Sequence, residues 1–207
     1  MSKKNKKIKL KPSRIIFLIV LIASNTLAWF IYATKIDSNV SVHVKGWNVV
    51  FEASENEVTD VVNITVDDLY PGMSNYSYDI SAYNNSEVSA TITYKILEAR
   101  ILSTTYVTQE GRANNGEPVQ AGDLTSSALE YKLSHEYPFT ISLSLSGTTL
   151  DEEVGKEDFT LSVVWPYESN NDALDTTWGI NAYNYKESYP NNPSLTLKVK
   201  LIITQDV

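Results

Sequence analysis

Apolar and polar residues alternate along most of the chain beyond residue 40, and a period of two predicts half-buried β-strands. The parity changes once, at Gly46, where a β-bulge would return the same face to the core. About eight strands with turn residues between them and at most two short helices predict an all-β fold, an antiparallel β-sandwich of the jelly-roll or immunoglobulin-like kind. The alternating segments are residues 40–44, 47–51, 62–66, 76–82, 88–96, 139–145, 159–165 and 195–203.

The segments between the strands give more specific expectations. Residues 76–97 resemble a β-hairpin whose turn is Asn84-Asn85-Ser86. The last strand carries outward Lys198 and Lys200, which would protect a sheet edge. Residues 109–127 contain three glycines and Pro118 and are the stretch with the weakest pattern, with a short helix or an irregular segment expected over 126–134. Residues 147–158 look like a polar, acidic connection.

The start of the chain has a different pattern. Seven Lys and Arg residues lie within residues 3–14, and the apolar stretch 15–33 follows. This stretch is 19 residues long, about enough to cross a bilayer as a helix. The basic flank predicts that the N-terminus stays in the cytoplasm and that the rest of the chain is exported.

Two interpretations of this leader remain open. It is either a permanent single-pass anchor or a signal peptide that is cleaved after Ala28, because Ser24-Asn25-Thr26 interrupts the apolar run just before that residue. We therefore expect two parts. Residues 1–35 form a basic N-terminus with a signal peptide or transmembrane anchor, and residues 36–207 form an extracellular β-sandwich domain. The membrane is the partner of residues 15–33 unless the leader is removed.

The charge of the chain supports this division. The net charge is −8, but eight of the 17 Lys and Arg residues lie in the first 35 residues, which contain no acid. The remaining nine basic and all 25 acidic residues give the rest of the chain a charge of −16. So acidic a body is a poor candidate for nucleic-acid binding. The absence of cysteine excludes disulfides, thiolate metal sites and cysteine nucleophiles.

The sequence offers little for catalysis. Its two histidines are His43 and His135. His135 begins the segment His-Glu-Tyr-Pro-Phe, which has Phe139 where the H-E-x-x-H motif of zinc peptidases needs its second histidine. There is no G-x-S-x-G motif and no glycine-rich phosphate loop. We therefore expect no enzyme, no cofactor and no small-molecule substrate.

One acidic loop is the candidate for a metal. Glu168, Asp172 and Asp175, with two asparagines between them, are oxygen ligands suited to calcium, although their spacing is not that of an EF-hand. The alternative is a structural loop in which Asp175 is the N-cap of a short helix over 176–185. Trp178 and Tyr183 would then cover the edge of the sandwich.

Several short motifs resemble the TasA/camelysin family of Gram-positive surface and biofilm-matrix proteins. They are the leader ending in LAWF (27–30), the segment LYPGMSNYSYDISAYNNSEVS (69–89) and the terminal PSLTLKVKLIITQ (193–205). The segment from Trp165 to Gly179 resembles one found in uncharacterised surface proteins with such leaders. The family resemblance implies a jelly-roll-like sandwich that is secreted or attached to cells and assembles into fibres. Camelysin itself is a metallopeptidase, but this chain has no matching metal-ligand motif.

These observations predict an exported structural protein of the cell surface or extracellular matrix. Self-assembly into fibres would follow if a freed segment near residues 29–45 paired with the open strand edge of a neighbour. One alternative is a membrane-anchored binding module that keeps its helix and presents tyrosine-rich loops to a glycan or a protein. The second alternative is a camelysin-like metallopeptidase.

Overall fold

The structure is a computed structural model that describes residues 13, 17, 20–21 and 48–206. The chain divides into two units, Met1–Val44 and Lys45–Val207. Of the apolar stretch 15–33, Phe17, Val20 and Leu21 are described, and each is helical. None of the helices within the described positions is long and apolar enough to cross a bilayer. The rest of that stretch and His43 lie outside the described residues, as do the predicted cleavage site at Ala28, the predicted strand 40–44 and the predicted bulge at Gly46.

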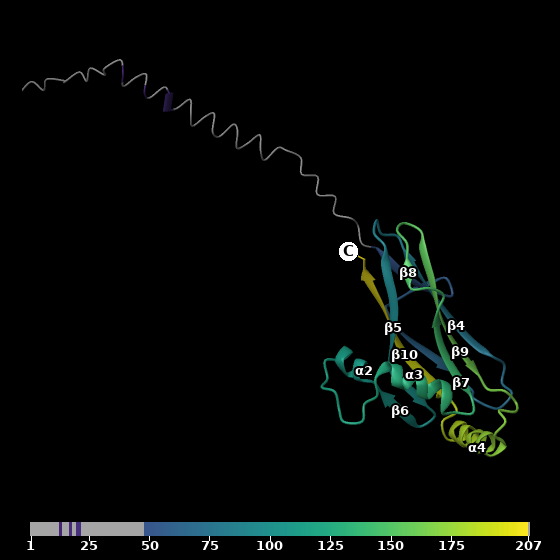
Figure 1. Ribbon diagram of the computed structural model, residues 1–207. Coiled ribbons are helices and arrows are strands. Elements are labelled where there is room, and N and C mark those ends of the chain that lie inside the picture. Colours follow the sequence, from purple (N-terminus) through teal and green to yellow (C-terminus); the bar gives the residue numbers. More distant parts are fainter. Residues whose placement is uncertain (1–12, 14–16, 18–19, 22–47, 207) are drawn as a thin grey trace, which may run out of the picture. The chain divides into compact units, whose positions relative to one another are not determined.

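Residues 48–206 form two antiparallel β-sheets, which confirms the prediction of a mainly β protein (Figure 1). Every strand pairs antiparallel with its neighbours. The first sheet has the order β2 (Asn56–Val58), β1 (Val49–Ala53), β4 (Tyr76–Asn84), β9 (Gly155–Val164), β7 (Thr140–Leu145). The second has the order β3 (Val61–Val66), β10 (Leu195–Gln205), β5 (Ala90–Ile101), β6 (Thr104–Val107), and β8 (Thr149–Leu150) also pairs with β5.

The inner faces of the two sheets share one hydrophobic core. Every second residue of β3, and of most of β9 and β10, is buried, as the period of two predicts. In β9, for example, Phe159, Leu161 and Val163 are fully buried, while the residues between them are only half-buried. In β5 the alternation breaks where Ile96 and Leu97 are both buried, at the register shift in its pairing with β10. Burial of apolar side chains from both sheets is the main force that holds the layers together.

The predicted hairpin over residues 76–97 is wrong, because its two strands belong to different sheets. β4 pairs with β1 and β9, whereas β5 pairs with β10, β6 and β8. The residues between β4 and β5 are therefore a crossing from one layer to the other. Alternation along the sequence shows which residues face the core, but it does not show which strand is the neighbour.

Asn84 occupies this crossing and is fully buried. Its side-chain Nδ2 donates to the carbonyls of Val88 (2.9 Å), Leu150 (3.1 Å) and Asp151 (3.0 Å). Its Oδ1 accepts from the backbone N–H of Ser86 at 3.0 Å. One amide thus pairs four backbone groups that have left the ladders at the corner where β4, β5 and the β8–β9 connection meet.

The prediction that the last strand is an edge strand is also wrong. β10 lies between β3 and β5 in the middle of its sheet. Lys198 and Lys200 lie on its half-buried outer face, where Lys200 is 3.8 Å from Asp60 and donates to Asn114 Oδ1 at 3.0 Å. These lysines therefore cover an outer sheet face and do not protect an edge.

Two segments contain more regular structure than their composition indicates. The connection predicted at 147–158 contains β8 and the start of β9. The stretch 109–127 contains α2 (Gln109–Asn114), in which Gly111 is buried against β5. A Cβ at Gly111 would lie 2.1 Å from the carbonyl oxygen of Leu97. This glycine therefore permits close packing and does not mark a loop.

Helices close one side of the sandwich. α3 (Ser126–His135), which confirms the expected short helix, packs against both β5 and β7. On one edge of β5, β8 pairs with the start of the strand and β6 with its end. Between these two parts, side chains bond the backbone of Ile96. The hydroxyl of Ser126 accepts from Ile96 N at 2.8 Å, and that of Thr108 donates to Ile96 O at 2.7 Å. This edge of β5 is therefore closed without a full-length neighbouring strand.

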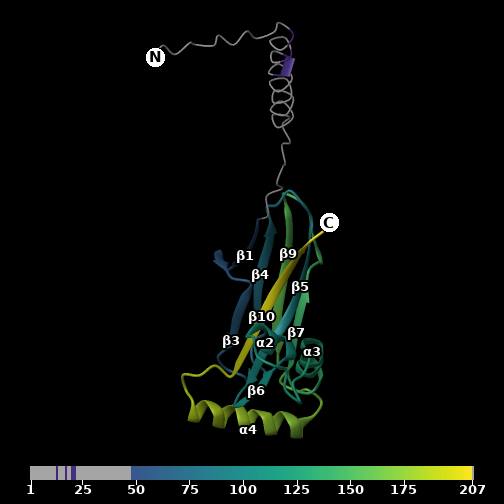
Figure 2. The same cartoon turned by 90° about the vertical axis from the view of Figure 1, so that its left-hand side faces the viewer.

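The third helix, α4 (Asp172–Ser188), lies across one end of the two sheets (Figure 2). Asn48, where the preceding residues join the body, bonds to residues 85 and 86 at the other end. The last strand also finishes at that end, since Gln205 pairs with Ala90. Because the long strands have about ten residues and rise about 3.3 Å per residue, α4 lies about 30 Å from Asn48.

The buried amide generates a stability prediction. Asn84→Ala removes the amide that bonds three carbonyls and one N–H at this buried corner, where Asp151 O keeps a second donor, the N–H of Gly155. We therefore expect the free energy of unfolding to fall by about 3 kcal/mol. Chemical denaturation followed by tryptophan fluorescence measures the change. Asn85→Ala is the matched control, because Asn85 is exposed and its side chain makes no hydrogen bond within residues 48–206; its cost should be below about 0.5 kcal/mol. Equal costs for the two variants would contradict the role of Asn84.

Candidate functional site

α4 begins earlier than the sequence predicts. The N-cap is Asn171, whose Oδ1 accepts from Leu174 N at 3.2 Å, and Asp172 and Asp175 lie in the first turn. Acidic side chains in the first turn stabilise a helix, because they interact favourably with the positive end of its dipole. The prediction of Asp175 as the N-cap is therefore wrong, since Asp175 lies inside the helix.

An aromatic cluster joins α4 to the core. The Trp178 ring lies 5.1 Å from Tyr137 and 5.8 Å from Phe139, both in edge-to-face geometry. Phe139 in turn lies 5.0 Å from Trp165, which is fully buried. The sequence predicts that Trp178 and Tyr183 both cover the edge of the sandwich. Trp178 instead packs on Tyr137 and Phe139 at one end of the sheets. Tyr183 covers nothing there, because 66% of its surface is exposed.

Asp175 fixes the start of α4 to the end of β9. Its carboxylate accepts from Trp165 Nε1 at 3.0 Å and from the N–H (3.1 Å) and hydroxyl (2.7 Å) of Ser169. These hydrogen bonds, that from Trp165 first, stabilise the ionised form and lower the pKa of Asp175. Asp175 is therefore a structural anion in this structure.

The three predicted calcium ligands line one shallow hollow. Glu168, Asp172 and Asp175 share its wall with Pro71 and Tyr167, and its volume is about 500 Å³. Among the residues that the structure describes, no three His, Cys, Asp or Glu side chains are grouped so that they could hold a metal ion. Both oxygens of Asp175 also have protein partners. Calcium binding at this loop remains a prediction.

A second hollow lies on the other side of α4, and we call it the α4 hollow. It forms between the helix and the β5–β6 turn and has a volume of about 480 Å³. This volume lies within the range of about 300–1,000 Å³ that is usual for ligand sites. Its lining residues are Ile101, Leu102, Ser103, Thr104, Trp178, Asn181, Asn184, Tyr185 and Tyr189.

Leu102 forms the floor of the α4 hollow in an unusual backbone conformation. Its φ is +51°, in the left-handed region that costs a residue with a side chain about 1–2 kcal/mol. Arg100 helps to hold the turn, since its Nη1 donates to the Leu102 carbonyl at 3.0 Å and also to the hydroxyl of Tyr185. Its Nη2 donates to Pro193 O and to Thr196 Oγ1, both at 3.0 Å. Leu102 N donates to Ser194 O at 2.7 Å, so the strained turn is fixed from both sides.

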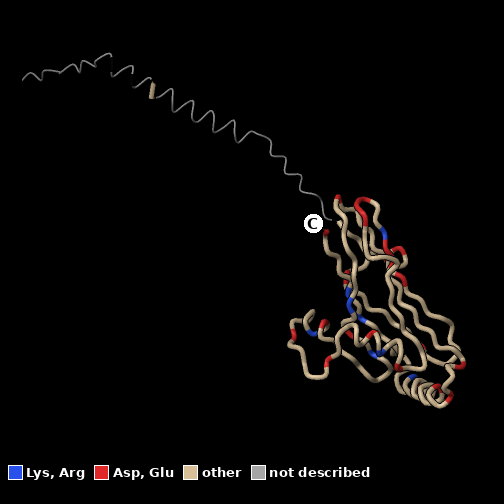
Figure 3. Tube along the Cα trace, viewed as in Figure 1, with Lys and Arg blue, Asp and Glu red and all other residues tan. Residues whose placement is uncertain are grey.

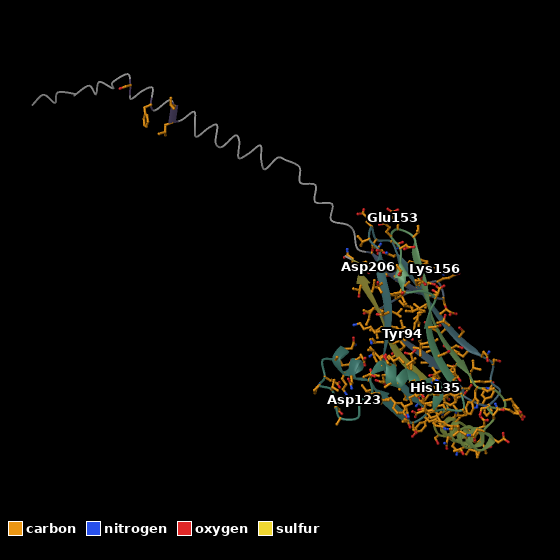
Figure 4. The ribbon with its side chains drawn as sticks, viewed as in Figure 1. Tyr94, Asp123, His135, Glu153, Lys156 and Asp206 are labelled. Atoms are coloured by element: carbon orange, nitrogen blue, oxygen red, sulfur yellow. The ribbon has the colours of Figure 1, made fainter. Side chains whose placement is uncertain are left out.

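The second histidine lies elsewhere. His135 ends α3, its ring stacks on exposed Tyr131 at 4.3 Å, and its Nδ1 lies 2.7 Å from Ser134 Oγ. Figure 4 places it on the helix, apart from the labelled acidic residues Asp123, Glu153 and Asp206. His135 is exposed at the end of α3.

The open edge of the second sheet is β3. Within residues 48–206 it pairs with β10 and with no other strand, and no helix packs on it. Its six residues, VVNITV, carry no charge, and Asn63 and Thr65 are exposed on its outer face. The other edge strands are shorter, as β2 and β6 are, or packed against α3, as β7 is.

Comparisons with known protein families, with curated proteins and with solved structures find no match to this chain. Function therefore rests on the sequence and on the geometry of the α4 end and the β3 edge. The sequence reasoning missed Asn181, Asn184 and Tyr189 as site residues. Their positions relative to Trp178 follow a helical repeat, which would have placed them near one another if the helix had been extended to residue 188.

The carboxylate of Asp175 generates a pH prediction. Its pKa is lowered in the folded state, so its contribution to stability is complete above the unfolded-state value of about 3.9 and is lost as the pH falls through the lower folded-state value. We expect Asp175→Asn to be less stable than the native protein at pH 7, with the difference shrinking below about pH 4. Denaturation midpoints measured across this pH range test it. Asp172→Asn, in the same turn but exposed, is the control and should have a much smaller effect.

Proposed function

We propose that this chain is an exported structural protein of the cell surface or extracellular matrix whose β-sandwich body assembles by strand addition at β3. The resemblance to the TasA/camelysin family and the predicted leader support export. We also propose that the sandwich is of the jelly-roll or immunoglobulin-like kind.

The observation that carries assembly is the open β3 edge. Proteins usually protect an exposed edge with charge, proline, a bulge or a covering element. β3 has no charged residue and no proline, and it has no covering helix in the described part of the chain. On the opposite side of the sandwich, α3 closes the space between β5 and β7. The two sides thus differ: among residues 48–206, β3 is the six-residue edge strand that no helix covers, whereas the six-residue β7 packs against α3.

The sequence provides a strand to occupy that edge. Residues 40–44 alternate Val40, Val42 and Val44 with Ser41 and His43, the pattern of a half-buried strand. They lie outside the described residues and immediately precede the body. We propose that this segment of one copy pairs with β3 of the next copy.

Charge opposes this association. Figure 3 shows acidic residues over both ends of the body and few basic ones, in keeping with a charge of −16 beyond residue 35. Like-charged copies repel one another at low ionic strength, and salt screens this repulsion over a distance of about 10 Å at 0.1 M. Assembly should therefore increase with salt and at low pH.

A lysine on the β3 edge should prevent assembly. Thr65→Lys places a charge on the outer face of the open edge and should raise the concentration needed for fibres about tenfold, equivalent to about 1.4 kcal/mol per contact. Sedimentation and electron microscopy of the purified protein measure this. Thr93→Lys is the control, because Thr93 is exposed on the outer face of β5 in the same sheet. Dispersed native monomers at every concentration, salt and pH tested would contradict the proposal, as would equal assembly of both variants.

A membrane-anchored binding module is the second candidate. The observation that favours it is the α4 hollow, where aromatic and polar side chains of α4 and the β5–β6 turn lie together. A camelysin-like metallopeptidase has no metal-binding group in its favour among the residues described.

The N-terminus of the protein in cells distinguishes the two candidates. We expect a mature chain that begins at Trp29 if the body is released for assembly, because Ala28 then provides the cleavage site. N-terminal sequencing of the exported protein measures this. A sequence that begins at Met1 or Ser2 would instead support the anchored module.

A further inference from the structure

We propose that the α4 hollow binds a neutral saccharide, with Tyr189 as an aromatic platform and Asn181, Asn184, Ser103 and Thr104 as hydrogen-bonding groups. This inference gives a ligand class to the binding-module candidate and does not depend on assembly at β3. The saccharide is one of the polymers of hexose or N-acetylhexosamine units that surround cells.

Aromatic rings provide the apolar surface. Tyr189 is 52% exposed, and its ring lies 5.2 Å from that of Tyr185, which is buried. Trp178 forms another part of the lining and is held in place by Tyr137 and Phe139. A pyranose ring has one face of C–H groups, which packs well against the electron-rich face of an aromatic ring.

The polar side chains around these rings are free to bond a ligand. The side chains of Ser103, Thr104, Asn181 and Asn184 are in exposed residues and make no hydrogen bond to the described part of the protein. An asparagine amide both donates and accepts, and a hydroxyl does the same. Together they match the donors and acceptors around the rim of a sugar ring. A few polar groups beside aromatic surface are typical of small-ligand sites.

The charge of the hollow indicates a neutral ligand. No acidic residue lines it, although the body of the protein is strongly acidic. No Lys or Arg lines it either. Arg100 lines an adjoining hollow with Tyr189, and both of its terminal nitrogens are already bonded within the protein. An anionic ligand would find no free cation in the hollow, and a cationic ligand would find no carboxylate.

The strained turn is a second, independent observation. Leu102 adopts φ +51° and is buried, although the two-residue turn could hold a glycine without strain. Strained residues of this kind gather at binding sites, where the surrounding structure fixes them. Here the strain presents Ser103 and Thr104 to the hollow and places the leucine side chain beneath it.

Isothermal titration of the full-length protein tests the proposal, in a detergent without a sugar headgroup so that the hollow is free. The probes are the neutral hexasaccharides of cellulose, starch, mannan and chitin, with hexagalacturonate as the anionic comparison. We expect at least one neutral probe to bind with a Kd of about 1 mM or tighter. Asn181→Ala/Tyr189→Ala should weaken this binding about tenfold or more, and Asn184→Ala alone should weaken it measurably.

Tyr183→Ala is the matched control, because Tyr183 is an exposed tyrosine of α4 that does not line the hollow; its effect should be below about twofold. Circular dichroism melts check that each variant is folded. The proposal is overturned if no neutral probe binds, if the variants bind the neutral probes like the native protein, or if hexagalacturonate is the one probe whose binding the double variant loses. Because N-terminal sequencing tests the anchor separately, failure here leaves that result unaffected.

Discussion

The crossing of the chain from one sheet to the other at Asn84 is the constraint on which the rest of the fold depends. A β-sandwich must carry its chain between layers, and backbone groups at such a corner lose both ladder partners and water. Here a single buried amide at the end of β4 binds three carbonyls and one N–H from two other segments, residues 86–88 and 150–151. It therefore fixes the end of β4, the start of β5 and the β8–β9 connection relative to one another, and with them the alignment of the two layers.

The inner faces of the strands could be predicted because burial imposes a local period of two, as in Phe159, Leu161 and Val163. The partner of each strand could not, since pairing depends on residues far away in the sequence. Asn84-Asn85-Ser86 has the composition of an exposed turn, and nothing local shows that its first residue is buried. Lys198 and Lys200 likewise have the same composition whether their strand is central or at an edge.

The helical parts show a similar limit. Gly111 resembles a loop residue in composition, yet its role is to let α2 lie against the carbonyl of Leu97. The α4 hollow needs two segments, the turn at Leu102 and the helix from Trp178 to Tyr189, which are separated by more than 70 residues in the sequence. Helical spacing could predict the second half. The first half depends on a backbone conformation that leucine seldom adopts, so no sequence pattern indicates it.

The order of strands in the second sheet has a consequence for avidity. β3 and β6 are its opposite edges, and the α4 hollow adjoins the β5–β6 turn, so pairing along β3 leaves the hollow open. Copies joined in this way would present one hollow per subunit at a regular spacing. Weak single contacts to a repeating polymer then add up, because each further contact forms at the high local concentration set by the first. A polymer of subunits would thus bind a polysaccharide matrix much more tightly than a single subunit does.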